Sequence, residues 1–375
     1  MNHSNEKRII YIDYIETIAI IMVVFCHGLV IGESVLANIL LQLTTTIAVP
    51  LFFMANGTLL LKDNNFSFSR HIKKTFLVLG SLLSWKILYF LAMLIRDYSA
   101  YSKLSFRDLL CFLSGQHIEE PYIPTEHFWF IYTLLAIYIV FPLIKVTYDN
   151  DKKIIKYIMI VLFFFVNVFT EVNTTCNLLL ERYGMKTIDL SILKSQLFPF
   201  AQGSNYLIFF LIGVFLHERF YSKKQRKQTI ILVMIAAVSF AIMLFQKYIQ
   251  QGTLAGEWVR LAGDYQRITT LIMATAIYAL FASLDYTNTT INKITVFVSK
   301  RTMNIFSVHY LLCMMYIWYI IPIFPYKTVL THSLRTIAIL FISIVITEPL
   351  TYIPGVSKVL GIKPDNYKKL NRTSF

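Results

Sequence analysis

Apolar stretches long enough to cross a lipid bilayer recur along the whole 375-residue chain. A hydrocarbon core about 30 Å thick is crossed by about 20 helical residues. The chain is 56% hydrophobic and only 15% charged, which is more apolar surface than one soluble core can bury. We therefore predict an all-α, polytopic membrane protein with about ten transmembrane helices, at residues 9–32, 35–61, 75–95, 127–146, 154–171, 198–217, 229–247, 266–285, 303–324 and 334–354.

The first of these runs does not have the pattern of a cleavable signal peptide. Asp13, Glu16 and His27 interrupt its apolar residues, and no small-residue cleavage site follows. The chain also contains no internal repeat, low-complexity tract or linker long enough to divide it. We therefore expect a single membrane domain over residues 1–375, whose last part, 355–375, is a basic cytoplasmic tail.

The basic residues are distributed unevenly between the two sides of the predicted membrane. The net charge is +14. With the N-terminus in the cytoplasm, the inner segments carry 23 Lys and Arg residues and the outer segments carry 11. Cytoplasmic loops of membrane proteins carry such an excess. The charge therefore indicates topology rather than a nucleic-acid partner, and it places both termini in the cytoplasm.

The sequence lacks the motifs of several kinds of metal, phosphate-binding and hydrolase sites. The four cysteines have no metal-ligand spacing, and the chain contains no glycine-rich phosphate loop, HExxH or GxSxG motif, so we expect no metal. Cys111 and Cys176 fall on predicted outer segments, where isolated thiols fit better than a disulfide. Two outer loops, 96–126 and 172–197, each contain a short amphipathic pattern, FRDLLCFL and LSILKSQLF, typical of a helix lying on the membrane surface.

Two titratable groups lie on one face of the first predicted helix. Glu16 and His27 are eleven residues apart, which is close to three helical turns, so their side chains point in the same direction roughly 16 Å apart. We interpret His27 as a general base or proton carrier and Glu16 as a residue facing a polar channel; a histidine bonded inside the bundle is the alternative for His27. Asp13 is either a helix cap or ion-pair partner at the inner interface or a contact to substrate.

Other polar residues fall where lipid should exclude them, at a cost of at least about 2.5 kcal/mol for a charged group. Lys86 lies at a depth similar to that of His27, and we expect it to face a pocket and pair with an acid or with substrate oxygens. His127, Trp129 and Tyr132 begin the fourth helix and form a predicted substrate contact at the outer mouth. His309 lies two turns into the ninth helix, as part of the donor site or as a helix-packing polar group.

With these residues in place, the chain resembles the acyltransferase 3 family of integral membrane acyltransferases. The segment YIDYIETIAIIMVVFCH resembles the family's first helix, in which an Asp, a basic residue and ten mostly apolar residues precede a catalytic His; Asp13 and His27 fill two of these places. RHIKK resembles a basic inner-loop motif of two arginines, represented by Arg70 and Lys73. VPLFFMANGTLLL, HFWFIYTLLAIYIVFP, FLIGVFL, MNIFSVHYLL and TEPL follow the family's order.

One position departs from the family pattern. The basic residue that precedes the ten-residue spacer is Glu16 here, so the charge at that point is reversed. Our hypothesis is that Lys86 supplies the missing cation, because a reversed charge in a membrane pocket is tolerated when an opposite charge is near.

The resemblance implies O-acylation of a glycan. The expected donor is cytoplasmic acetyl-CoA, bound through its phosphates by Arg70, Lys73 and Lys74, although these residues also fit as topology-determining charges. The expected acceptor is a sugar hydroxyl of a cell-surface or capsular polysaccharide, or of a lipid-linked glycan, at the bacterial cytoplasmic membrane. The alternative is a proton-coupled exporter or flippase of a glycan or lipid-linked intermediate. Apart from the acceptor we expect membrane lipids as partners; the sequence gives no oligomeric state.

Overall fold

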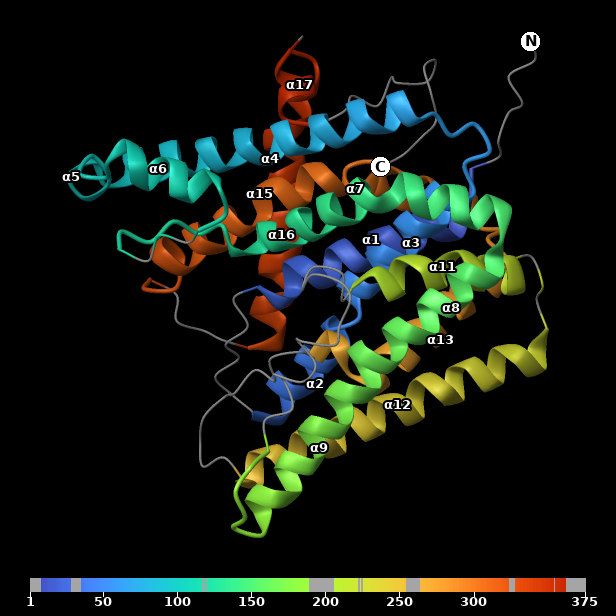
Figure 1. Cartoon of the computed structure of the whole chain (residues 1–375). Coiled ribbons are helices and arrows are strands. Elements are labelled where there is room, and N and C mark those ends of the chain that lie inside the picture. The colour runs from blue at the N-terminus through green and yellow to red at the C-terminus, as the bar shows by residue number, and fades with distance from the viewer. Residues whose placement is uncertain are drawn as a thin grey trace, which may run out of the picture.

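A computed structural model describes residues 8–27, 35–116, 118, 120–188, 206–221, 223, 225–253, 264–323, 328–353 and 355–361. Within these ranges all regular elements are helices (Figure 1). The first half of the chain forms α1 (Ile10–Cys26), α2 (Val35–Thr45), α3 (Ala48–Leu61), α4 (Phe68–Arg96), α5 (Tyr98–Tyr101), α6 (Phe106–Leu113), the 3-10 turn η1 (Glu126–Phe128), α7 (Trp129–Asn150), α8 (Lys152–Leu162), the π-helix η2 (Phe163–Val168) and α9 (Phe169–Arg182).

The second half is also helical. It forms α11 (Leu207–Phe220), α12 (Arg226–Thr253), the 3-10 turn η4 (Asp264–Gln266), α13 (Ile268–Ser283), α14 (Thr289–Ser299), α15 (Thr302–Met315), the π-helix η5 (Tyr316–Ile320), α16 (Val329–Thr351) and α17 (Val356–Val359).

The all-helical, multi-pass prediction is confirmed. By length and apolar composition, seven helical segments of the described chain could cross a membrane: 39–61, 68–96, 126–150, 152–182, 226–247, 302–320 and 329–351. The three other predicted spans coincide with the shorter helices α1, α11 and α13, of 17, 14 and 16 residues. The count of ten spans and the cytoplasmic position of both termini stay predictions.

Of the two predicted outer loops, 96–126 contains the expected short helix, whereas 172–197 begins too early in the prediction. α6 confirms the amphipathic helix at FRDLLCFL, and it begins with a capping box between Ser105 and Asp108. The helix expected to end at residue 171 instead continues through η2 and α9 to Arg182. Its last turns are polar, so the hydropathy pattern ends before the helix does. LSILKSQLF lies outside the described residues, as does most of the predicted tail 355–375.

None of the four cysteines, all of which lie in the described ranges, forms a disulfide bond.

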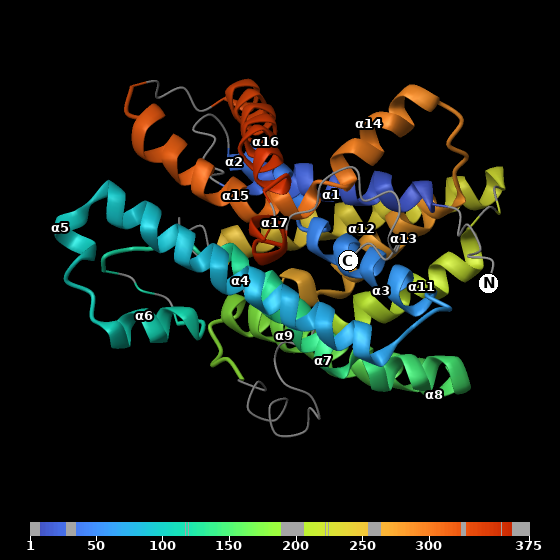
Figure 2. The same ribbon diagram turned by 90° about the horizontal axis from the view of Figure 1, so that it is seen from above.

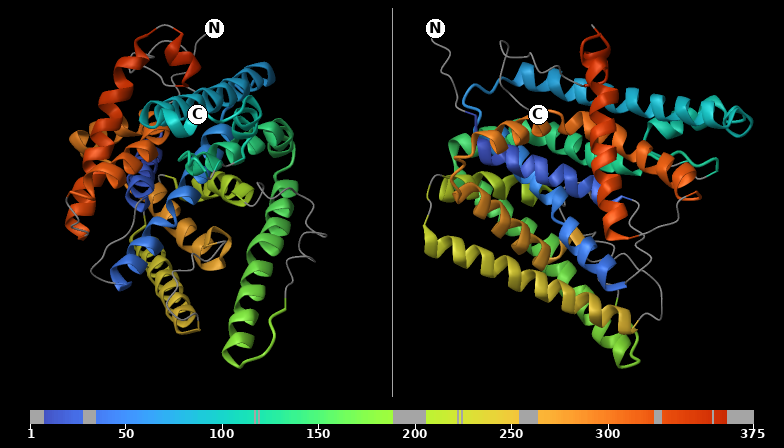
Figure 3. Two further views of the ribbon diagram at one scale, coloured as in Figure 1. Left: turned by 90° about the vertical axis from the view of Figure 1, so that its left-hand side faces the viewer. Right: turned by 180° about the vertical axis from the view of Figure 1, so that it is seen from behind.

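The centre of the bundle is formed by α1, α3, α11 and α13, which pack against one another. α4 and α7 lie on one side of this centre, and α12 lies along the opposite edge, where it contacts α9 (Figure 1). α8 packs against α7 and α11. α5 and α6 extend beyond one end of the bundle beside α4 (Figure 2). α16 crosses the long helices at a steep angle (Figure 3) and packs against α1 and α15.

The closest crossing in this centre is between α3 and α11, at two glycines. A Cβ atom added to Gly57 would collide with the backbone carbonyl of Phe210, and one added to Gly213 would collide with that of Met54. Small residues allow membrane helices to approach this closely, where van der Waals packing replaces the hydrophobic effect as the main attraction. Both glycines belong to motifs that carry the family resemblance, MANG and FLIG, so these motifs have a packing role.

Side chains larger than glycine at this crossing should destabilise the fold. Gly57→Val adds volume against backbone atoms that cannot rotate away, and we expect a loss of about 3 kcal/mol or more, since overpacking costs about 1–3 kcal/mol even against movable side chains. Thermal unfolding of the detergent-purified protein measures this loss. The matched control is Gly80→Val in α4, where a Cβ atom would meet no other atom within 4 Å. Equal melting temperatures for the two variants would contradict the close crossing.

Candidate functional site

The C-terminal end of α1 is held by two residues of α16. His332 Nε2 donates a hydrogen bond to the carbonyl of Phe25 at 2.6 Å, and Arg335 Nη2 donates to the carbonyl of His27. Both side chains are buried, and they lie 3.3 Å apart at their nearest nitrogens. The last carbonyls of a helix have no partner within the helix and carry partial negative charge, so a cation is favourable there. These two hydrogen bonds fix the C-terminal end of α1 and therefore the position of the His27 backbone.

Three histidines from distant parts of the sequence meet at this end of α1. The ring of His27 lies 5.2 Å from that of His309, and the ring of His309 lies 5.3 Å from that of His127, measured between ring centroids. Tyr310 contacts both outer members, at 4.7 Å from His27 and 4.9 Å from His127. His27 is partly exposed, whereas His127 and His309 are buried. We call His27, His127, His309 and Tyr310 the histidine cluster.

Three ring nitrogens of His127 and His309 lack hydrogen-bond partners among the described residues. His309 Nδ1 lies 2.7 Å from the carbonyl of Phe306, which can only accept, so Nδ1 carries the hydrogen and Nε2 presents a lone pair. That Nε2 atom has no partner, and neither ring nitrogen of His127 has one. Buried polar atoms are nearly always satisfied, so such a group indicates a site completed by another molecule.

Polar side chains extend the cluster towards the loop before α7. Tyr122 and Tyr310 form a hydrogen bond between their hydroxyl oxygens at 3.4 Å. Burial and this hydrogen bond raise the pKa of the Tyr122 phenol above its usual value, so its hydroxyl remains a donor at neutral pH. Oε2 of Glu126 is buried without a hydrogen-bond partner, one residue before His127. The cluster therefore has both donors and acceptors for a polar substrate.

His127, Trp129 and Tyr132, which the sequence places at one outer mouth, lie in three different environments. His127 belongs to the histidine cluster. Trp129 packs against Tyr206 and Tyr265, at centroid distances of 5.1 and 5.8 Å. Tyr132 donates to the carbonyl of Leu113. Each residue of a helix is rotated by about 100° from the one before it, so neighbours in sequence face different neighbours in space.

Lys86 does not pair with an acid. Its Nζ donates to the carbonyl of Phe112 and, at 3.2 Å, to the hydroxyl of Tyr132. These contacts place a cation at the C-terminal end of α6, where the helix dipole favours it. No ion pair joins Lys86 to Glu16 in the described part of the chain, so the hypothesis that Lys86 compensates the reversed charge has no direct contact behind it and stays a prediction. Its contacts hold the surface helix α6 against α4 and α7.

Glu16 and Asp13 share one hydroxyl group instead. Oγ of Ser299 lies 2.7 Å from Asp13 Oδ1 and 2.6 Å from Glu16 Oε2. A serine hydroxyl has one hydrogen and can donate to only one of them. Arg8 binds both oxygens of Asp13, which fixes that group as the carboxylate. The hydrogen between Glu16 and Ser299 therefore belongs to Glu16, which removes the charge reversal without a second cation.

The three inner basic residues lie at the first turns of α4. Arg70 and Lys73 are exposed, and Arg70 donates to the carbonyl of Asn65. Lys74 is partly buried with its Nζ 5.4 Å from the centroid of the Tyr138 ring. This arrangement leaves two cations accessible to a phosphate-bearing ligand. Asp13 is the ion-pair partner of Arg8, as one of the two interpretations expected.

Sequence reasoning missed His332 and Arg335, and it did not join His309 to His27. His332 and Arg335 are three residues apart in an apolar segment, so they share a face, and this signal was available in the sequence. Among the described residues, no three His, Cys, Asp or Glu side chains are placed to bind a metal ion together.

Comparison with known proteins identifies one match. The family model named acyltransferase 3, described as an acyltransferase domain, matches residues 9–352, a range that includes the whole histidine cluster. No curated protein and no solved structure matches the chain.

Removing the cation at the end of α1 should loosen that end. In Arg335→Gln, the carbonyl of His27 loses a charged donor, and such bonds contribute about 1.5–3 kcal/mol. Hydrogen exchange of the peptide covering residues 23–27 should accelerate about tenfold or more. Arg96→Gln is the control, because the exposed Arg96 stacks on Trp318 and does not contact α1. Unchanged exchange in Arg335→Gln would contradict this positioning role.

The neutral state of Glu16 can be tested by replacing its carboxyl group with an amide. Glu16→Gln keeps a hydrogen-bond donor towards Ser299, so we expect a stability change below about 0.5 kcal/mol. Asp13→Asn removes the carboxylate that binds Arg8 and should cost about 1–3 kcal/mol. Thermal unfolding at pH 7 compares the two variants. If Glu16→Gln destabilises as much as Asp13→Asn, Glu16 is charged and the assignment fails.

Proposed function

We propose that this chain, which belongs to the acyltransferase 3 family, transfers an acetyl group from cytoplasmic acetyl-CoA to a sugar hydroxyl of a surface glycan, at the histidine cluster. The observation that carries the proposal is the contact of His27 with His309, and of His309 with His127, in a multi-pass membrane protein, where His309 Nε2 and both ring nitrogens of His127 lack a hydrogen-bond partner among the described residues.

An imidazole is the group that this reaction needs. A sugar hydroxyl is a weak nucleophile, and a positioned base that removes its proton as the new C–O bond forms contributes about 10² to 10⁴-fold. The hydroxyl oxygen attacks the thioester carbonyl carbon, the C–S bond breaks, and the CoA thiol leaves with a proton. His27 is the proposed base because it is partly exposed, whereas His127 and His309 are buried, and because Arg335 positions its backbone.

The neighbouring rings support this role. His309 Nδ1 donates its hydrogen to the Phe306 carbonyl, so His309 Nε2 can accept a proton or a hydrogen bond from a substrate in the cluster. Tyr122, Tyr310 and Glu126 provide donors and an acceptor for further sugar hydroxyls. Trp129 lies with Tyr206 and Tyr265, and such amphipathic rings commonly serve as platforms for a sugar face.

The donor is proposed to enter from the opposite end of the bundle. Arg70 and Lys73 are exposed at the start of α4, on the side that the charge distribution assigns to the cytoplasm. Ammonium and guanidinium groups bind phosphate oxygens by charge-assisted hydrogen bonds, which suits the phosphates of CoA. We place the protein in the bacterial cytoplasmic membrane, with a capsular or other surface polysaccharide, or its lipid-linked precursor, as acceptor.

Acetyl transfer should depend on His27. With purified protein in nanodiscs, labelled acetyl-CoA and the native glycan, His27→Ala should lower the transfer rate by about 10² to 10⁴-fold, because the base is lost. Thermal unfolding checks that the variant is folded.

The control for this experiment is the adjacent residue. Cys26 donates to the carbonyl of Val23 at 3.1 Å, and its side chain is rotated by about 100° around α1 from that of His27. Cys26→Ala should keep the wild-type rate, which also excludes an acyl-cysteine intermediate. Wild-type acetylation by His27→Ala refutes the base assignment, and glycan transport without thioester consumption favours the exporter.

A further inference from the structure

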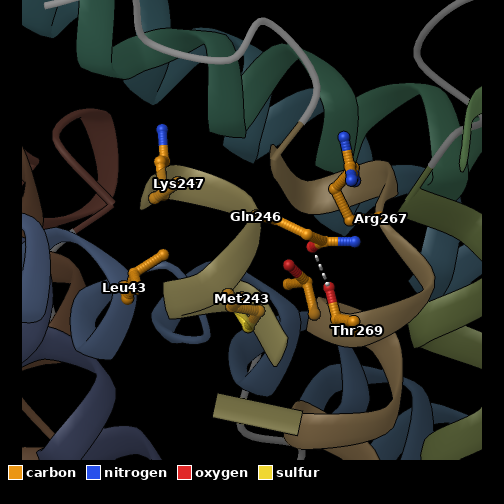
Figure 4. A pocket seen from close by; sticks show the side chains of 7 residues that line it. Leu43, Met243, Gln246, Lys247, Arg267 and Thr269 are labelled. Carbon is orange, nitrogen blue, oxygen red and sulfur yellow. Dashed lines mark hydrogen bonds between the residues drawn. The ribbon is translucent and has the colours of Figure 1, made fainter. Parts of the chain in front are cut away.

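A small pocket lies away from the histidine cluster, where α2, α12 and α13 meet. It is lined by Leu43, Met243, Gln246, Lys247, Arg267, Thr269 and Thr270 (Figure 4). Five of these seven side chains are polar, although the helices that supply them are largely apolar. Lys247 and Arg267 extend in the same direction above Leu43 and Met243 (Figure 4). Both are buried, with exposed fractions of 6% and 5%.

Arg267 is held on one side and unsatisfied on the other. Its Nη2 forms an ion pair with Oε1 of Glu171 at 2.7 Å. Its Nε and Nη1 atoms, which carry three of the five N–H donors of a guanidinium group, are buried without a hydrogen-bond partner. Unsatisfied donors on a charged group are costly in a buried environment, so this arrangement indicates a missing acceptor.

The rest of the pocket holds Arg267 in place. Glu171 also accepts from Gln246 Nε2 at 2.9 Å and from the backbone N–H of Ile268 at 3.3 Å. Gln246 in turn accepts from Thr269, although this contact is long at 3.5 Å (Figure 4). Glu171 therefore joins α9, α12 and α13 around the guanidinium, and the geometry does not depend on a ligand being bound.

The size and depth of the pocket select a class of ligand. The pocket encloses about 10 Å³, which is room for about one oxygen atom of a larger group. Gln246 and Lys247 lie some 20 residues after the first residue of α12, and about 20 helical residues cross the hydrocarbon core. The pocket is thus at the end of the bundle that the charge distribution assigns to the outer face, at the depth of lipid phosphates.

We propose that this pocket binds the phosphate group of a lipid, with one phosphate oxygen seated on Arg267 beside Lys247. Guanidinium–phosphate pairs are strong because the hydrogen bonds are charge-assisted and the donors are arranged in a fixed plane. The phosphate belongs either to a bilayer lipid or to a lipid-linked glycan.

A lipid-linked glycan bound here would lie near the proposed sugar platform. Tyr265, two residues before Arg267, packs against Trp129, and Trp129 is two residues from His127. Residues 265–267 therefore link the phosphate pocket to the aromatic rings, and residues 127–129 link those rings to the histidine cluster. This role in presenting the acceptor rests on the proposed function, whereas phosphate binding does not.

The experiment measures lipid binding to the full-length protein in a phosphate-free detergent, by native mass spectrometry. The probes are a polyprenyl phosphate and a phosphatidic acid, each paired with its uncharged counterpart, a polyprenol and a diacylglycerol. We expect a phosphorylated probe to bind at least about tenfold more tightly than its uncharged counterpart, and Arg267→Gln to abolish that difference. Arg267→Lys keeps the charge and should retain part of it. The control is Lys186→Gln, which removes an exposed cation after α9 and should change nothing.

The outcomes are distinguishable. Selectivity for the polyprenyl phosphate alone identifies the lipid-linked acceptor, and equal selectivity for both phosphates identifies bilayer lipid. No phosphate preference in the folded wild-type protein, or an unchanged preference in both Arg267→Gln and Lys247→Gln, overturns the proposal. His27→Ala should bind as the wild-type protein does, so a failure of the acetyltransferase function would not alter this measurement.

Discussion

The contact between Arg335 and the carbonyl of His27 determines whether the histidine cluster exists. It places a buried cation against the last carbonyls of α1, where the helix leaves partial negative charge without an internal partner. Because α16 crosses the bundle steeply, its first turns reach the end of α1 rather than running alongside it (Figure 3). The ring of His27 is thereby held against α15, which carries His309 and Tyr310. A proposed base that is positioned in this way needs no ordering when substrate arrives.

The buried polar groups of the described bundle serve two different purposes. Most are satisfied and join helices. Tyr11 bonds His217 at 2.8 Å and Tyr278 at 3.3 Å, and Tyr278 bonds Thr58 at 2.6 Å, so these four side chains tie together the four central helices. Lys86 belongs to this group, since its contacts hold α6. Buried polar atoms without a hydrogen-bond partner among the described residues occur at several places. The histidine cluster, through His127 and His309, and the pocket of Arg267 each contain more than one such nitrogen atom.

Much of the architecture could be predicted from hydropathy because lipid requires long, internally hydrogen-bonded helices. The positions of α4, α7, α12 and α16 follow from apolar runs alone, and α6 follows from its amphipathic pattern. The extension of α9 to Arg182 could not be found in this way, because its last turns are polar and are bonded to one another and to the following loop, as Asn177 is to Ile188. His27 could be singled out because a titratable residue in an apolar helix is costly. Its partners could not, because a helical pattern gives the face of a residue but not which helix it meets.

The sequence by itself determined the helical class, the membrane environment and the family, because the lengths of apolar runs and the order of motifs can be read directly from the linear chain. The tertiary structure decided which polar residues act together. Lys86 and Glu16 seemed complementary by charge, yet one binds the end of α6 and the other shares a hydroxyl with Asp13. His27, His127 and His309 are far apart in sequence. They come together because α15 and α16 pack against α1, and because His127 of η1 packs against His309 of α15. Packing of helices fixes such meetings, and packing depends on the whole set of side chains at once.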